Sequence, residues 1–89
     1  MSANIHIHPY LQDVTNGMKV VEVNGNTVGA CLDHLVRQFP GTGKELFDID
    51  GTLSPYVDIW INGDSAYPEE LAKQVPDGSE LYITRVGGC

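Results

Sequence analysis

Residues 28–39 carry the pattern that most restricts the fold of this chain, because apolar side chains recur there with the period of an α-helix. The positions of this apolar stripe are Val28, Cys31, Leu32, Leu35, Val36 and Phe39. Thr27 precedes the stripe and is a favourable N-cap, since its hydroxyl can accept a hydrogen bond from the first helical turn. Pro40 and Gly41 are predicted to end the helix. A chain with one long amphipathic helix buries it most economically against one face of a sheet.

Five further segments are predicted to form β-strands. In the first, Ile5 and Ile7 alternate with two histidines, which places the isoleucines on one buried face. The later predicted strands are residues 19–24, 57–62, 65–67 and 80–86. Asn62-Gly63 is typical of a two-residue hairpin turn. The expected connections are residues 11–17 and 44–56, both irregular, and residues 68–73, a single helical turn.

Charge and size restrict the function. The chain has 89 residues, enough for one small domain, and its 5 Lys and Arg against 12 Asp and Glu give a formal charge of −7. Such a surface repels nucleic acid and anionic lipid, so we expect neither as a partner and consider a basic protein surface a better match. No apolar run approaches the roughly 20 residues of a membrane span, and no signal-peptide pattern is present, so we expect a cytoplasmic protein. Cys31 and Cys89 make neither a disulfide framework nor a four-thiolate metal site.

Several short motifs occur in an order and at a spacing that resemble one known family. They are residues 25–30 (GNTVGA), 39–41 (FPG), 57–63 (VDIWING), 77–81 (DGSEL) and 87–88 (GG). The chain is therefore similar to the ThiS/MoaD-type ubiquitin-like sulfur carriers, and its length fits the molybdopterin and cysteine branches better than the thiamin branch. The resemblance implies an α+β, ubiquitin-like β-grasp fold with a mixed four- to five-stranded sheet and one main helix packed on one face. It also implies a single domain over residues 1–86 and a flexible Gly-Gly-Cys tail over residues 87–89.

The function implied by this resemblance is that of a carrier without catalytic residues, metal or cofactor of its own. In the family, the carboxylate of the final glycine is adenylated with ATP by an E1-like activating enzyme and is then converted to a thiocarboxylate. Gly87 and Gly88 match the two family glycines, so Gly88 is the implied attachment point. A tail without side chains suits a narrow enzyme channel. The implied partners are this activating enzyme, a sulfur donor and an acceptor synthase.

Cys89 departs from the family pattern, because it places the carboxyl of Gly88 in a peptide bond. Either Cys89 is removed by a JAMM-type zinc metalloprotease, as extra residues are in some family members, or its thiol carries sulfur as a persulfide. We favour removal, since no basic residue is closer in sequence than Arg85 and such a thiol gains little thiolate. A protein modifier joined to lysines through Gly88, and a regulatory module with an idle tail, are the alternative functions.

One face of the predicted sheet is expected to contact partner proteins. In the ubiquitin-like strand order the last strand lies between the first and the third. Trp60 and Tyr82 then face away from the helix, together with His6 and His8. Aromatic side chains on a solvated face mark protein contacts more often than chance. The predicted partner-binding residues are Trp60, Tyr82, Arg85 and Val86. An aromatic lid over loop residues is the structural alternative.

Three other features are interpreted as structural. Residues 47–53 (FDIDGTL) match the nucleophile motif of haloacid-dehalogenase-type phosphatases, but the rest of the chain offers no suitable metal-binding acidic pair, so we expect a surface loop. His6 and His8 have a spacing that a metal could use, yet no third ligand is in view. Cys31 lies on the apolar stripe and is expected in the core.

Overall fold

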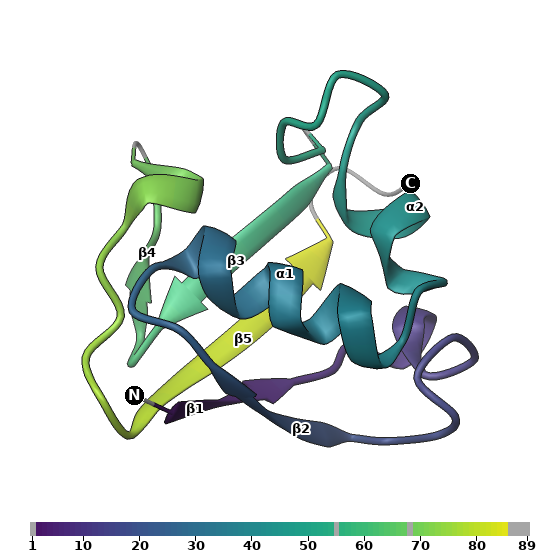
Figure 1. Ribbon diagram of the computed structural model, residues 1–89, viewed down its shortest axis with the longest axis horizontal. Coiled ribbons are helices and arrows are strands. Elements are labelled where there is room, and N and C mark those ends of the chain that lie inside the picture. The colour runs from purple at the N-terminus through teal and green to yellow at the C-terminus, as the bar shows by residue number, and fades with distance from the viewer. Residues whose placement is uncertain (1, 55, 68, 86–89) are drawn as a thin grey trace.

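The computed structural model describes residues 2–54, 56–67 and 69–85, which form a five-stranded mixed sheet with one long helix on one face (Figure 1). The strands are β1 (Ser2–His6), β2 (Val20–Asn24), β3 (Val57–Ile61), β4 (Asp64–Ser65) and β5 (Ser79–Arg85). The helical elements are α1 (Val28–Gln38), α2 (Thr42–Leu46), and the 3₁₀ turns η1 (Pro9–Leu11) and η2 (Glu70–Ala72). The expected architecture, a mixed sheet with one main helix on one face, is confirmed.

Strand β5 lies at the centre of the sheet, whose order is β2-β1-β5-β3-β4. It pairs in parallel with β1 and antiparallel with β3, and the outer pairs β1–β2 and β3–β4 are antiparallel. The β3–β4 hairpin turns at Asn62 and Gly63, both with positive φ (51° and 91°), as a type I′ turn requires. The predicted turn and the predicted central position of the last strand are therefore confirmed, although β4 is shorter than expected.

Helix α1 begins and ends where the sequence predicts. The Thr27 hydroxyl accepts a hydrogen bond from the backbone N–H of Ala30 at 3.1 Å, which caps the first turn. The helix ends at its C-cap, Phe39, directly before Pro40. The buried residues of the stripe are Val28, Cys31, Leu32 and Leu35. Val36 and Phe39 are only half-buried, so the stripe is fully covered over its first two turns and opens toward its end.

The hydrophobic core lies between α1 and the inner face of the sheet. Its strand residues are Ala3, Ile5, Val21, Val23, Val57, Ile59, Ile61, Leu81 and Ile83, which alternate with outward-facing neighbours as predicted. Leu11 and Leu46 are also fully buried, although both belong to segments expected to be irregular. Leu46 ends α2, a five-residue helix that begins at Thr42 and extends into the segment 44–56. The prediction of an irregular segment is wrong there, because one short turn of helix leaves no apolar period in the sequence.

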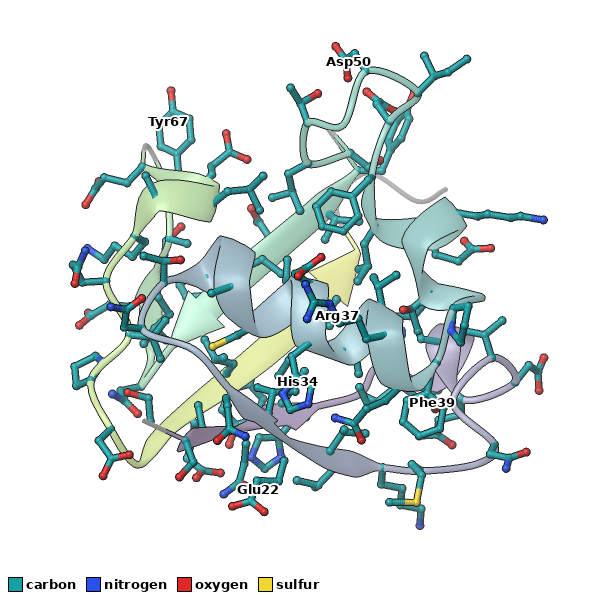
Figure 2. All side chains as sticks on the ribbon, in the orientation of Figure 1. Glu22, His34, Arg37, Phe39, Asp50 and Tyr67 are labelled. Carbon is teal, nitrogen blue, oxygen red and sulfur yellow. The ribbon has the colours of Figure 1, made fainter. Side chains whose placement is uncertain are left out.

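Side chains of α1 cover the outer edge of β2. His34 Nδ1 accepts a hydrogen bond from the backbone N–H of Asn24 at 2.7 Å. Gln38 Nε2 donates to the backbone oxygen of Glu22 at 3.1 Å, and Figure 2 shows His34 on the side of α1 nearest β2. These bonds occupy backbone groups that an edge strand otherwise offers to another chain.

Candidate functional site

The sheet face that α1 leaves uncovered carries a row of side chains across all five strands, termed here the aromatic row. In register order it consists of Val20, His6, Tyr82, Trp60 and Ser65, one residue from each strand. Tyr82 and Val20 are exposed (43% and 41%), and Trp60 is half-buried. The predicted placement of Trp60, Tyr82 and His6 on one face is confirmed, and His8 is exposed beyond the end of β1.

His6 is held in place by its neighbours on the open face. Its ring stacks on Tyr82, with ring centroids 4.2 Å apart and planes inclined by 10°. Its Nε2 lies 2.6 Å from Glu80 Oε1, and Asn4 Nδ2 donates to Glu80 Oε2 at 3.0 Å. The hydrogen bonds from Asn4 and from His6 lower the pKa of Glu80 below its ordinary value. The network fixes the ring of Tyr82 from one side, and it joins residues 76 positions apart that sequence reasoning did not connect.

The charged residues of the open face are predominantly acidic. The outward positions of β1, β2, β3 and β5 are even-numbered, and their acidic residues are Glu22, Asp58 and Glu80. None of these described outward positions holds lysine or arginine, and His6 is their only basic side chain. The open face therefore combines aromatic surface with negative charge, which suits a partner with positive charge.

Strand β5 leads into the predicted tail. Its last residue, Arg85, pairs with Val57 at the start of β3, so the strand is hydrogen-bonded to a neighbour up to its end. The predicted contact residue Val86, the attachment point Gly88, and the flanking Gly87 and Cys89 lie outside the described residues. Their roles, and the partner-binding role of Arg85, stay predictions.

The acidic motif at residues 47–53 forms a loop that is exposed over residues 48–52, while Phe47 and Leu53 at its ends are half-buried and pair with each other. Asp50 Oδ1 accepts hydrogen bonds from the hydroxyl and the backbone N–H of Thr52, at 2.7 and 3.2 Å, and both lower the pKa of Asp50. Ile49 is fully exposed, and Figure 2 shows Asp50 at the tip of the loop. A phosphatase would require the motif to follow a buried parallel strand, but here it follows the short helix α2. Its interpretation as a surface loop is confirmed.

The remaining candidate ligands do not converge on a metal site. Among the described residues, no group of three or more His, Cys, Asp and Glu could hold a metal ion. Cys31 is fully buried in the core as expected, and burial raises the pKa of its thiol. No helix in the described ranges is long and apolar enough to cross a membrane.

Comparison with known proteins relates this chain to a sulfur carrier and to a protein modifier of the same fold. No protein-family model matches the chain. It is 30% identical over 86 residues to the sulfur carrier protein CysO of Mycobacterium tuberculosis, a match that covers 93% of this chain and 92% of CysO. The crystal structure of Mycobacterium tuberculosis CysO superposes with a TM-score of 0.87 at 28% identity, covering 94% and 98% of the two chains. SAMP1, small archaeal modifier protein 1 of Haloferax volcanii, gives a TM-score of 0.86 at 29% identity over 100% of both chains.

The sequence match and the structural superposition with CysO thus both extend over nearly the whole chain. The superpositions confirm the ubiquitin-like β-grasp fold that the sequence motifs implied. A sulfur carrier is a substrate that enzymes load and unload, and it is not an enzyme itself. The chain belongs to the ThiS/MoaD-type family of ubiquitin-like sulfur carrier proteins, to which CysO also belongs.

Proposed function

We propose that this chain carries sulfur as a thiocarboxylate on Gly88, after Cys89 has been removed. The observation that carries the proposal is the match to the sulfur carrier CysO over 93% of the chain. The diglycine supports it, since Gly87-Gly88 follows the central strand β5 with only Val86 between them. A carrier needs a stable folded domain joined to a reactive C-terminal segment. In this sequence the diglycine comes one residue after the last strand of the domain.

Loading requires a free carboxylate on Gly88, because the peptide bond to Cys89 leaves no carboxylate oxygen to react. After hydrolysis, a Gly88 oxygen attacks the α-phosphorus of ATP and pyrophosphate leaves. A sulfide-level sulfur nucleophile then attacks the acyl carbon and displaces AMP, which leaves the thiocarboxylate. An E1-like activating enzyme supplies the ATP site, a donor protein supplies sulfur, and a JAMM-type metalloprotease supplies the hydrolysis. A synthase of cysteine or molybdopterin biosynthesis accepts the sulfur, and we place these steps in the cytosol, where ATP is available.

The open face gives these enzymes a surface to hold. Gly88 follows Tyr82 by six residues, a length that spans at most about 21 Å when fully extended. An enzyme that binds the aromatic row therefore keeps the attachment point within a limited reach. We assign Trp60 and Tyr82 to this recognition, with Arg85 and Val86 as the contacts that lead into the tail.

The test compares protein that ends at Gly88 with protein that retains Cys89. Only the form ending at Gly88 should support ATP–pyrophosphate exchange by the activating enzyme, and Cys89→Ser should leave the longer form inactive. Intact-mass spectrometry of protein from its native cells should show loss of Cys89 and replacement of one oxygen by sulfur. Native protein that keeps Cys89 and carries sulfur on that thiol would replace this mechanism with the persulfide one.

Protein modification is the second candidate function. It is favoured by the similarity to SAMP1, a protein named as a modifier, at 29% identity over both full chains. An adenylated Gly88 can be attacked by a lysine amine instead of a sulfur nucleophile, which gives an isopeptide bond. Incubation of the protein ending at Gly88 with native lysate and ATP should then give a ladder of covalent conjugates. A carrier without this activity should give only the thiocarboxylate mass.

A further inference from the structure

The open face carries two half-buried carboxylates near its aromatic side chains, and only one of them has a partner among the described residues. Both oxygens of Glu80 are engaged, one by Asn4 at 3.0 Å and one by His6 at 2.6 Å. Asp58 is half-buried on the same face, yet no described residue forms a hydrogen bond or ion pair with its carboxylate. A carboxylate that is partly withdrawn from water gains from a charged hydrogen-bond donor. Asp58 is therefore the group that this face offers to a ligand.

Asp58 lies beside the two aromatic residues at the centre of the row. It precedes Trp60 by two positions on β3, and its register partner on β5 is Thr84, two positions after Tyr82. Neighbouring strands are about 4.8 Å apart and two residues span about 7 Å along a strand. The four side chains thus stand at the corners of a small rectangle, with two aromatic rings at one end and a carboxylate and a hydroxyl at the other.

The orientation of the Tyr82 ring is fixed by stacking on His6. His6 covers one of its faces at a centroid distance of 4.2 Å. Because β1 and β3 flank β5 on opposite sides, the second face of the Tyr82 ring is turned toward β3 and Trp60. An aromatic face that is already oriented loses little freedom when a planar cation stacks on it.

We propose that the rectangle of Asp58, Trp60, Tyr82 and Thr84 is a site for the guanidinium group of an arginine from a partner protein. The planar guanidinium stacks on the aromatic rings, while its N–H groups donate to the Asp58 carboxylate and the Thr84 hydroxyl. Lysine fits less well, because its ammonium is a strongly hydrated point charge that cannot stack as a plane or donate from a fork.

The surrounding charge selects a basic partner surface. The outward positions of the described strands hold Glu22 and Glu80 in addition to Asp58, and the whole chain has a formal charge of −7. Negative charge of this extent attracts a basic surface before contact, and the rectangle then fixes its register. The inference rests on the proposed function in one respect: the partner that presents the arginine is the activating enzyme, which must grip the body while the tail reacts.

The site can be tested without a partner enzyme, because Trp60 is the single tryptophan of the chain and its fluorescence reports on the rectangle. We expect hexa-arginine to change the emission at a concentration at least roughly fivefold below that of hexa-lysine, a peptide of equal charge. Asp58→Asn should weaken hexa-arginine binding roughly fivefold and largely remove its advantage over hexa-lysine. Thr84→Val, which keeps the charge, should weaken it by a smaller factor.

The matched control is Asp64→Asn, the same loss of charge at an exposed position of β4 whose register partner is the inward-facing Ile61. It should affect both peptides equally and only slightly. Equal responses of the parent protein to the two peptides would reject the arginine site. An equal loss of hexa-arginine affinity in Asp58→Asn and Asp64→Asn would also reject it. Either outcome would mean that the peptides are attracted by the overall charge of the protein.

A second measurement connects the site to loading. In ATP–pyrophosphate exchange with the protein ending at Gly88, Asp58→Asn should raise KM roughly fivefold with kcat unchanged, and Asp64→Asn should leave both unchanged. An unchanged KM for Asp58→Asn would reject the activating enzyme as the source of the arginine. If the parent protein supports no exchange, the proposed function fails, while the peptide titration still decides whether the arginine site exists.

Discussion

The two faces of the sheet are built from the same strands but differ in what their side chains do. Toward α1, residues such as Ile5, Ile59 and Leu81 are at most 2% exposed, and all are aliphatic. Away from α1, the same strands present Tyr82, Trp60, amides and carboxylates. An inner position accepts any apolar residue of suitable volume. The outer aromatic residues are not needed to fill a core, and recognition of a partner is their predicted role.

The largest expected effect of a substitution is on the inner face. Leu35→Ala in α1 and Ile59→Ala in β3 should each lower the free energy of unfolding by about 2–5 kcal/mol, because both side chains are buried and leave a cavity. Urea unfolding measures the change, and Val36→Ala, at a half-buried position of the same helix, should cost clearly less. Two single variants as stable as the parent would show that the inner face does not carry the stability of the domain.

A substitution on the outer face should instead affect binding. Trp60→Ala should weaken binding to the activating or acceptor enzyme roughly tenfold or more, as loss of an interface aromatic typically does. Its loss of stability should be smaller than that of Leu35→Ala, since Trp60 is outside the core. Titration calorimetry measures the affinity, with Tyr67→Ala, an exposed tyrosine outside the row, as the control. Unchanged affinity for both enzymes, or loss of the fold, would contradict a recognition role.

The smallest expected effect is a pH dependence of the outer face. The folded-state pKa of Glu80 lies below its ordinary value of 4.5, so its ionised form stabilises the fold above that pH and this contribution is lost as the pH falls through the folded-state value. Glu80→Gln should therefore be slightly less stable than the parent at pH 7, with a difference that shrinks below pH 4.5. Urea midpoints over this range measure it.

Asn4 provides the matched variant for this pH dependence. Its side chain is the main cause of the lowered pKa of Glu80, so Asn4→Ala should reproduce most of the effect while keeping the carboxylate. Parallel stability curves for the parent and Glu80→Gln from pH 7 to pH 3 would mean that the hydrogen bonds seen at Glu80 do not stabilise the folded state.

Most of the fold could be predicted from local signals in the sequence. The Thr27 cap, the Asn62-Gly63 turn and the alternation of buried strand residues need only a few neighbouring positions each, and all are present. The burial of Leu11 and Leu46 could not be predicted in this way, since elements distant in sequence cover them. Helix α2, with five residues, is also too short to show a period.

The candidate site was predictable to the extent that it depends on strand order. Trp60 and Tyr82 could be assigned to one face once the last strand was placed in the centre. The alternation of Glu22 with Val21 and Val23 places Val20 on the same face. Glu80 is engaged by Asn4 and His6, while Asp58 has no partner among the described residues. Both facts depend on register between distant strands, which the sequence pattern does not specify.

The central position of β5 also determines when the protein can fold during its synthesis. Ala3 of β1 pairs with Ser79 of β5, and β1 and β3 meet only through β5. A nascent chain can form helix α1 early, but it cannot close the sheet until β5 has left the ribosome. A product of translation interrupted before β5 therefore cannot complete the sheet. The strand at the centre of the sheet is thus the last of the described elements to emerge.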